Sequence, residues 1–220
     1  MNRLPSVTAF AASCLLACTM PGIAQAAPVF VNGSFESPGV FYQAPGGGNS
    51  TAITGWTTAL SGVEHYNSPA YGVGAAADGV MAVDLAYYTS LAGGAIEQAL
   101  DTVAGETYTV NFFAGNSTNG GRTGTGIVKI SIDGVDLVDI ATPNATTVAT
   151  VWAQRSFSFM ATDSSSVVRF WNNQNPLVHF ALIDGISMAA PGTSGAVPEP
   201  GSLALASLGL LGLVAARRRR

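Results

Sequence analysis

Apolar and polar side chains alternate along the middle of the chain, and this alternation predicts β-strands. Every second side chain is apolar in residues 107–112 (TYTVNF), and residues 128–132 (VKISI) show the same period of two. Successive side chains of a strand point to opposite faces, so each segment predicts a strand with one buried face. Asp133-Gly134 follows the second segment directly and is typical of the tight turn of a β-hairpin.

Further strands are predicted by the same pattern and by short apolar runs at 80–85, 95–100, 155–160, 166–171 and 179–188. No stretch has a convincing helical period, and glycine-rich connections separate the strands. Many short strands joined by glycine and asparagine turns predict an all-β fold, an antiparallel β-sandwich or jelly roll, over residues 27–190.

The first 26 residues have the pattern of a signal peptide. Arg3 precedes an apolar run at 7–20, and Ala24-Gln25-Ala26 supplies the small residues that signal peptidase requires. An alternative is a loose lipobox that would lipidate Cys18. Cleavage after Ala26 removes both cysteines, so we expect a mature protein without disulfides.

The C-terminal end predicts a membrane anchor. Residues 202–216 contain no charge and no proline, and four arginines follow at 217–220. A helix of this length is short for a bilayer, so the arginines would snorkel at the cytoplasmic surface and hold the preceding chain outside the inner membrane. The alternative is a buried core helix with a solvated basic end, which four consecutive arginines disfavour.

A proline-rich linker at 191–201 precedes this helix. Its motif and the basic tail resemble the PEP-CTERM sorting signal of Gram-negative bacteria; they comprise Pro198, Glu199, Pro200, Arg217, Arg218, Arg219 and Arg220. The resemblance implies a precursor held transiently in the inner membrane and processed by an exosortase. It also implies delivery to the cell surface or to an extracellular exopolysaccharide matrix.

The predicted domain is strongly acidic. Four of the nine basic residues and twelve of the thirteen acidic residues lie between 27 and 196, so its net charge is −8. Such a surface repels phosphate backbones, which argues against a nucleic-acid partner. It also leaves carboxylates that can bind a hard cation such as calcium.

Five segments occur in the order seen in galactose-binding-like jelly rolls: VNGSFESPG (31–39), ITGWT (53–57), DGVMAVDL (78–85), IEQALDTVAGETYTVNFFAG (96–115) and FALIDGISM (180–188). The chain thus resembles a superfamily that includes carbohydrate-binding modules and plant cell-wall proteins of unknown function that share the opening NGSFE. The resemblance implies a jelly-roll fold, which by itself does not fix the ligand.

Two acids stand among apolar residues near the first and last predicted strands. In related carbohydrate-binding modules such acids serve a structural calcium site, and the resemblance gives this role to Glu36 and Asp184. The alternative is that both acids bind loop backbone or are solvated at strand ends. Phe35 and Trp56, in the same motifs, are expected in the core.

Sugar recognition needs exposed aromatic rings that stack on pyranose faces, with polar groups that bind hydroxyls. The aromatic candidates lie in segments predicted to be loops: His65, Tyr66, Tyr71, Tyr87 and Tyr88. Glu64, Asn67 and Asp84 are candidates for the polar contacts. Each aromatic residue has the alternative role of packing within its loop.

No catalytic motif accompanies His65 and His179, and no phosphate-binding loop is evident, so we do not expect an enzyme. The sequence predicts an exported surface or matrix protein whose module binds polysaccharide without catalysis. The alternative is a structural or adhesion protein that acts through protein–protein contacts.

Overall fold

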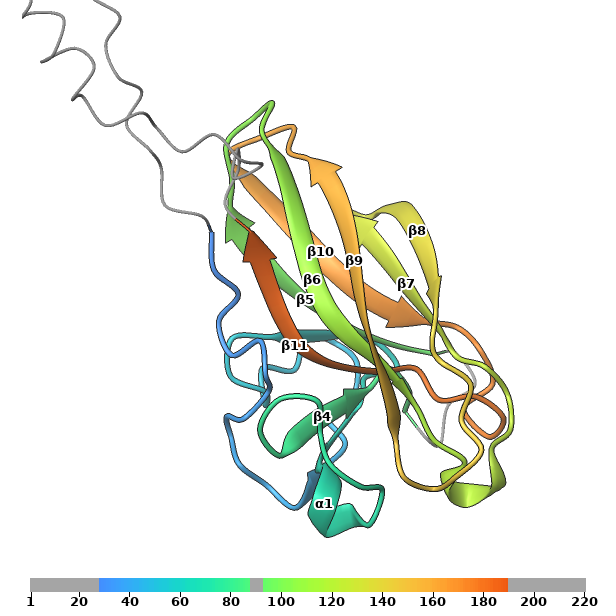
Figure 1. Ribbon diagram of the computed structural model, residues 1–220. Coiled ribbons are helices and arrows are strands. Elements are labelled where there is room, and N and C mark those ends of the chain that lie inside the picture. Colours follow the sequence, from blue (N-terminus) through green and yellow to red (C-terminus); the bar gives the residue numbers. More distant parts are fainter. Residues whose placement is uncertain (1–27, 88–92, 190–220) are drawn as a thin grey trace, which may run out of the picture.

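The alternating segments form the centre of two antiparallel sheets in the computed structural model, which describes residues 28–87 and 93–189 (Figure 1). The first sheet has the strand order β1-β3-β4-β11-β6-β9. Its strands are β1 (Tyr42–Gln43), β3 (Glu64–Asn67), β4 (Met81–Asp84), β6 (Thr107–Asn116), β9 (Val151–Met160) and β11 (Leu182–Ala189). Its longest pairing joins β6 to β9 over ten residues.

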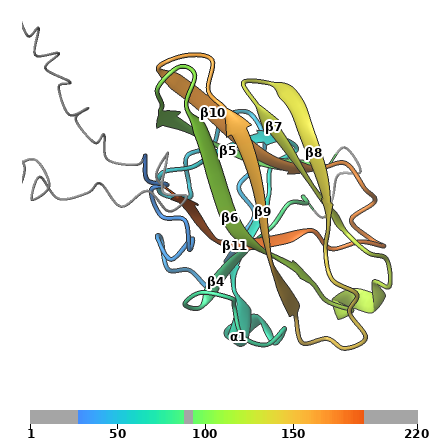
Figure 2. The ribbon, with the colours of Figure 1, turned by 45° about the horizontal axis from the view of Figure 1, so that its top comes forward.

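The second sheet has the order β2-β5-β10-β7-β8 and lies behind the first, as Figures 1 and 2 show. Its strands are β2 (Thr57–Leu60), β5 (Gly94–Asp101), β7 (Ile127–Ile132), β8 (Val135–Ala141) and β10 (Ser165–Asn172). A four-residue helix, α1 (Ser68–Tyr71), and a 3₁₀ turn, η1 (Asn119–Gly121), lie outside the sheets. The predicted antiparallel β-sandwich is confirmed.

The core fills the space between the sheets with the apolar faces of the alternating strands. Phe112 of β6 and Phe170 of β10 meet edge to face, 5.3 Å between ring centroids. Trp56 packs against Phe170 and Phe35, and its Nε1 donates a hydrogen bond to the carbonyl of Asn32 at 3.0 Å. Phe35 and Trp56 are fully buried, which confirms their predicted place in the core.

Every segment with a predicted strand contains one, although the last begins at Leu182 instead of His179. The predicted hairpin between β7 and β8 is confirmed, and both turn residues, Asp133 and Gly134, have positive φ (51° and 81°) as this turn requires. The sequence did not predict α1, η1 or the short strands β1, β2 and β3. These elements have only two to four residues, too few to show a period.

The chain leaves the sandwich at the end opposite α1. Strand β11 starts beside β4, where Leu182 pairs with Asp84, and ends seven residues later at Ala189, roughly 24 Å away at about 3.4 Å per residue (Figure 1). The predicted signal peptide, linker, membrane helix and basic tail lie outside the described residues. Within the described ranges, no helix is long and apolar enough to span a membrane.

Candidate functional site

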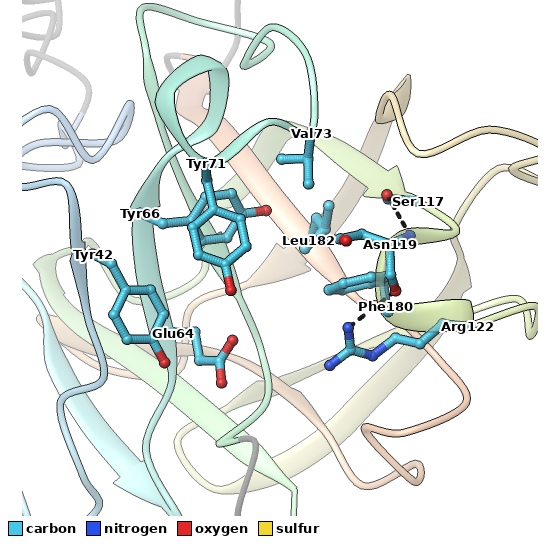
Figure 3. Close-up of a pocket in the computed structure, with 11 residues that line it drawn as sticks. Tyr42, Glu64, Tyr66, Tyr71, Val73, Ser117, Asn119, Arg122, Phe180 and Leu182 are labelled. Atoms are coloured by element: carbon cyan, nitrogen blue, oxygen red, sulfur yellow. Dashed lines mark hydrogen bonds between the residues drawn. The ribbon is translucent and has the colours of Figure 1, made fainter.

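A cavity of about 280 Å³ opens at the α1 end of the sandwich, between the edge of the first sheet and the β6–β7 loop. One side is formed by tyrosine rings with Glu64 beside them, and the other carries Arg122, Asn119 and Phe180 (Figure 3). The lining residues are Tyr42, Glu64, Tyr66, Tyr71, Val73, Ser117, Asn119, Gly120, Arg122, Phe180 and Leu182.

Three tyrosine rings form the aromatic side. Tyr42 on β1 and Tyr66 on β3 are cross-strand partners, and both rings contact that of Tyr71 at centroid distances of 5.8 and 5.3 Å. Tyr66 is buried, whereas Tyr71 is 41% exposed and stands at the rim. Ring faces and hydroxyl groups therefore line one wall of the cavity (Figure 3).

Local capping places Tyr71 at the rim. The side chain of Asn67 accepts a hydrogen bond from the backbone N–H of Ala70 at 3.0 Å and so starts α1. Gly72 ends the helix in the left-handed conformation (φ 87°), which glycine adopts without steric cost. The single helical turn between them holds Tyr71 against Tyr42 and Tyr66.

Glu64 lies among these rings on the same face of β3 as Tyr66. Tyr42 hydrogen-bonds its carboxylate. Burial, together with the negative charge of Glu64, raises the pKa of Tyr42 to about 12. The Tyr42 hydroxyl therefore stays protonated at physiological pH and donates its hydrogen bond to the Glu64 carboxylate.

Arg122 faces the aromatic wall from the other side of the cavity (Figure 3). Its guanidinium lies over the ring of Phe180, 4.0 Å from the centroid. Nε donates to the carbonyl of Pro176, and Nη1 donates to the carbonyl of Asn119 at 3.2 Å. These contacts hold the buried cation in one orientation at the cavity wall.

Asp84 is sealed behind Glu64 and does not line the cavity. It is the cross-strand partner of Glu64, is 1% exposed, and has no well-aligned hydrogen bond to either carboxylate oxygen within the described structure. Burial and the charge of Glu64 raise the pKa of Asp84 to about 7, although Arg122 and the backbone of Ala181 lower it. An acid that is half protonated near neutral pH, Asp84, therefore lies directly behind the cavity wall.

This pKa predicts that stability falls as the pH rises. Because the folded state holds the Asp84 proton up to about pH 7 and the unfolded chain only to about 3.8, rising pH favours the unfolded chain between these values. We expect Asp84→Asn to flatten this slope and to raise the free energy of unfolding by about 1–2 kcal/mol at pH 8, because it removes a buried negative charge. The unpaired N–H groups of the buried amide offset part of this gain. Denaturation at pH 4.5 and pH 8 measures both effects, and a variant less stable than wild type at pH 8 would contradict the prediction.

Two protein-family models match the sequence of this chain. The family model described as "Protein of unknown function (DUF642)" matches residues 28–188, which include both sheets and the cavity. The chain belongs to the DUF642 family. The PEP-CTERM protein-sorting motif matches residues 196–220. The DUF642 domain is thus followed by an export signal with a transient membrane anchor, as the sequence predicts.

Solved structures similar to this DUF642 protein include sugar-binding folds at low identity. The C-terminal domain of EclA, a sugar-binding protein, is 19% identical with a TM-score of 0.35, and the match covers 42% of this chain and 64% of that one. A family 35 carbohydrate-binding module from Clostridium thermocellum is 18% identical with a TM-score of 0.40, covering 58% and 92%. The arabinose-bound α-L-arabinofuranosidase MgGH51 is 15% identical with a TM-score of 0.46, covering 75% and 26%. No curated protein matches the sequence.

The DUF642 domain brings together two of the five predicted aromatic residues, Tyr66 and Tyr71. Tyr87 is half-buried and does not line the cavity, and Tyr88 lies outside the described residues. Of the polar candidates, Glu64 lines the cavity, Asp84 lies behind it and Asn67 caps α1.

His65 lies on the opposite face of β3 from the cavity. Its segment is a strand and not the loop we predicted, so His65 points away from the side on which Glu64 and Tyr66 lie. The buried ring is hydrogen-bonded through Nε2 to the carbonyl of Phe35 at 2.8 Å and through Nδ1 to Gln43 at 2.7 Å. Burial lowers its pKa, which keeps the ring neutral at this structural position.

Sequence reasoning missed Tyr42, Asn119, Arg122 and Phe180. Arg122 carried a usable signal, because it is one of only four basic residues in a domain of net charge −8 and lies in a glycine-rich loop. Tyr42 had none, since its strand has two residues. Its place in the cavity depends on pairing with β3.

Glu36 and Asp184 hold one loop from two sides. Oε1 of Glu36 accepts the backbone N–H groups of Val80 and Met81 at 2.8 and 2.7 Å. Oδ2 of Asp184 accepts those of Ala77 and Asp78 at 2.9 and 2.8 Å. Loop hydrogen bonding was the alternative role that the sequence left open for both acids.

These contacts satisfy the two carboxylates without a metal ion. A calcium ion needs six to eight oxygen ligands, so the two carboxylates would have to be joined by backbone carbonyls or waters. Among the described residues, no group of three or more His, Cys, Asp and Glu side chains is placed to hold a metal. Calcium binding at Glu36 and Asp184 stays a prediction.

Proposed function

We propose that this protein is an exported, non-catalytic polysaccharide-binding module whose binding site is the tyrosine-lined cavity. The observation that carries the proposal is the meeting of three tyrosines with Glu64 and Arg122 in one cavity. Tyrosine rings stack on the C–H faces of sugars, a carboxylate accepts hydrogen bonds from sugar hydroxyls, and a guanidinium donates to sugar oxygens.

Binding fits the cavity better than hydrolysis. Glycosidases use two carboxyl groups that flank the scissile bond. Of the two neighbouring acids here, only Glu64 lines the cavity, whereas Asp84 is sealed from it. A sugar in the cavity would reach one carboxylate and no second one.

The position of the cavity suits display from a membrane or a surface. The chain continues toward the sorting motif from Ala189, at the end of the sandwich opposite the cavity (Figure 1). Anchored in the inner membrane through 202–216, the precursor would present the cavity away from the bilayer. We propose that an exosortase then processes the Pro198-Glu199-Pro200 segment and that the domain reaches the cell surface or an exopolysaccharide matrix.

Sugar binding is tested with the full-length protein in a detergent without a sugar headgroup. We expect at least one neutral glycan of an array to be retained, and isothermal titration calorimetry to give a dissociation constant in the micromolar to millimolar range. Heat-denatured protein provides the control for surface adsorption. Equal, low signals on every glycan and on purified exopolysaccharide would reject the proposal.

Protein–protein adhesion is the second candidate, and an apolar groove favours it. The groove lies between the edge strands β8 and β9 and is lined by Val135, Leu137 and Met160, of which Val135 is 71% and Met160 63% exposed. An apolar edge of this kind is typical of a contact surface. Concentration-dependent self-association that sugars do not affect would support this candidate.

A further inference from the structure

An exposed phenylalanine extends the aromatic wall beyond the cavity. Phe41 directly precedes β1, is 62% exposed and does not line the cavity. Its ring lies 6.2 Å from that of Tyr71, between centroids, with 40° between the planes. The carbonyl of Phe41 accepts the backbone N–H of Asn67 at 3.0 Å, which fixes the backbone of Phe41 at the start of α1.

Tyr71 therefore joins two aromatic surfaces. Its ring contacts Tyr42 and Tyr66 on the cavity side and Phe41 on the outer side. Single exposed apolar residues are common on protein surfaces and carry no meaning. Here the exposed ring continues a wall whose next two members, Tyr71 and Tyr42, are 41% and 40% exposed.

The volume of the cavity limits what can enter it. At about 280 Å³ it lies at the lower limit of small-molecule sites, which span about 300–1,000 Å³. It accommodates one sugar unit and not a chain. Any further unit has to leave over the rim, where Tyr71 and Phe41 supply the exposed ring surface.

The charges around the cavity select against anionic sugars. Glu64 lines it, Asp84 lies directly behind, and the domain carries a net charge of −8. The positive charge of Arg122 is offset by the attraction of the guanidinium to the buried Asp84 carboxylate, and Glu64 adds a second acid at the same place. A uronate would bring a further negative charge to this acidic site.

We infer that the cavity and Phe41 form two consecutive subsites for a neutral polysaccharide chain, one unit in the cavity and the next stacked on Phe41. This inference rests on the proposed function and adds the chain length and the charge of the ligand. Only a ligand with at least two sugar units can contact the exposed ring of Phe41 while one unit occupies the cavity. The cavity alone gives the affinity for a single unit.

Calorimetry on the full-length protein, in the same detergent, tests both points. The probes are the methyl glycosides of glucose, galactose, mannose and xylose, the homotrisaccharides of these sugars, and trigalacturonate. We expect a neutral trisaccharide to bind about tenfold more tightly than its methyl glycoside, which is the gain from one aromatic stacking contact. Trigalacturonate is expected to bind more weakly than the neutral trisaccharide.

Phe41→Ala separates the two subsites. The variant should lose the tenfold gain and keep the affinity for the methyl glycoside within about twofold, because Phe41 does not line the cavity. Met160→Ala, equally exposed at the far end of the sandwich, is the matched control and should bind like wild type.

The outcomes distinguish this inference from the proposed function. If methyl glycosides bind but trisaccharides bind no more tightly, or if Phe41→Ala weakens both alike, the second subsite is wrong and the cavity remains. If trigalacturonate binds more tightly than the neutral trisaccharides, the inference that the ligand is neutral is wrong. If wild type binds none of the probes, the proposed function fails and the subsites with it.

Discussion

Replacing Tyr71 with alanine is expected to weaken sugar binding by about 10- to 100-fold, because the site loses a stacking surface worth about 1.4–2.8 kcal/mol. Tyr71 contacts the rings of Phe41, Tyr42 and Tyr66, so its loss opens the wall on both sides of the rim. The same residue is 41% exposed at the end of a one-turn helix, where alanine is well tolerated. The sandwich should therefore stay folded.

Tyr71→Phe is the matched control, since it keeps the ring and removes only the hydroxyl. We expect its affinity to fall by no more than about threefold, and both variants to give the circular dichroism and melting temperature of wild type. Calorimetry with the tightest-binding trisaccharide measures the affinities. If Tyr71→Ala binds like wild type, the cavity is not the sugar site.

The architecture could be predicted because most strands are long enough to show their period. β10 alternates buried and more exposed positions along all its eight residues, β6 does so over 107–114 and β7 over 127–130, and Asp133-Gly134 marks the hairpin by its turn chemistry. These are local signals, and they need no knowledge of which strands become neighbours. The all-β sandwich followed from them alone.

The site was less predictable because it forms where distant segments meet. Tyr66 and Tyr71 were found because their aromatic side chains cluster in sequence, but Tyr42 reaches them only through the β1–β3 pairing. Arg122 comes from the β6–β7 loop, about fifty residues further along the chain. His65 was misplaced because a one-residue step along a strand changes the face to which a side chain points.

For Glu36 and Asp184, the sequence predicted that the carboxylates need partners but did not decide which partners these are. Isolated carboxylates among apolar residues predict compensation, and both Glu36 and Asp184 are compensated. Composition does not say whether the compensating group is a metal ion or a backbone amide. The loop at 77–81 supplies the amides, and no sequence pattern marks it as their partner.

Asp184→Ala is expected to lower the free energy of unfolding by about 3 kcal/mol at pH 6. The fully buried carboxylate accepts N–H groups from Ala77 and Asp78 through Oδ2 and from Gly185 through Oδ1, so alanine leaves three donors without an acceptor. Burial raises the pKa of Asp184 to about 7 although these amides lower it, so at pH 6 the side chain is largely neutral. The loss then reports the hydrogen bonds and not the release of a buried charge.

Urea denaturation of the full-length protein measures this loss, with Asp136→Ala as the matched control. Asp136 is exposed on β8, so its removal should change the free energy of unfolding by less than about 0.5 kcal/mol. Thermal melts at pH 7.5, in about 1 mM calcium and in chelator, test the predicted calcium binding. A bound ion would raise the melting temperature of wild type and not of Asp184→Ala. If Asp184→Ala is as stable as the control, the acid does not hold the 77–81 loop, and the β4–β11 contact would have to be stabilised by the apolar core alone.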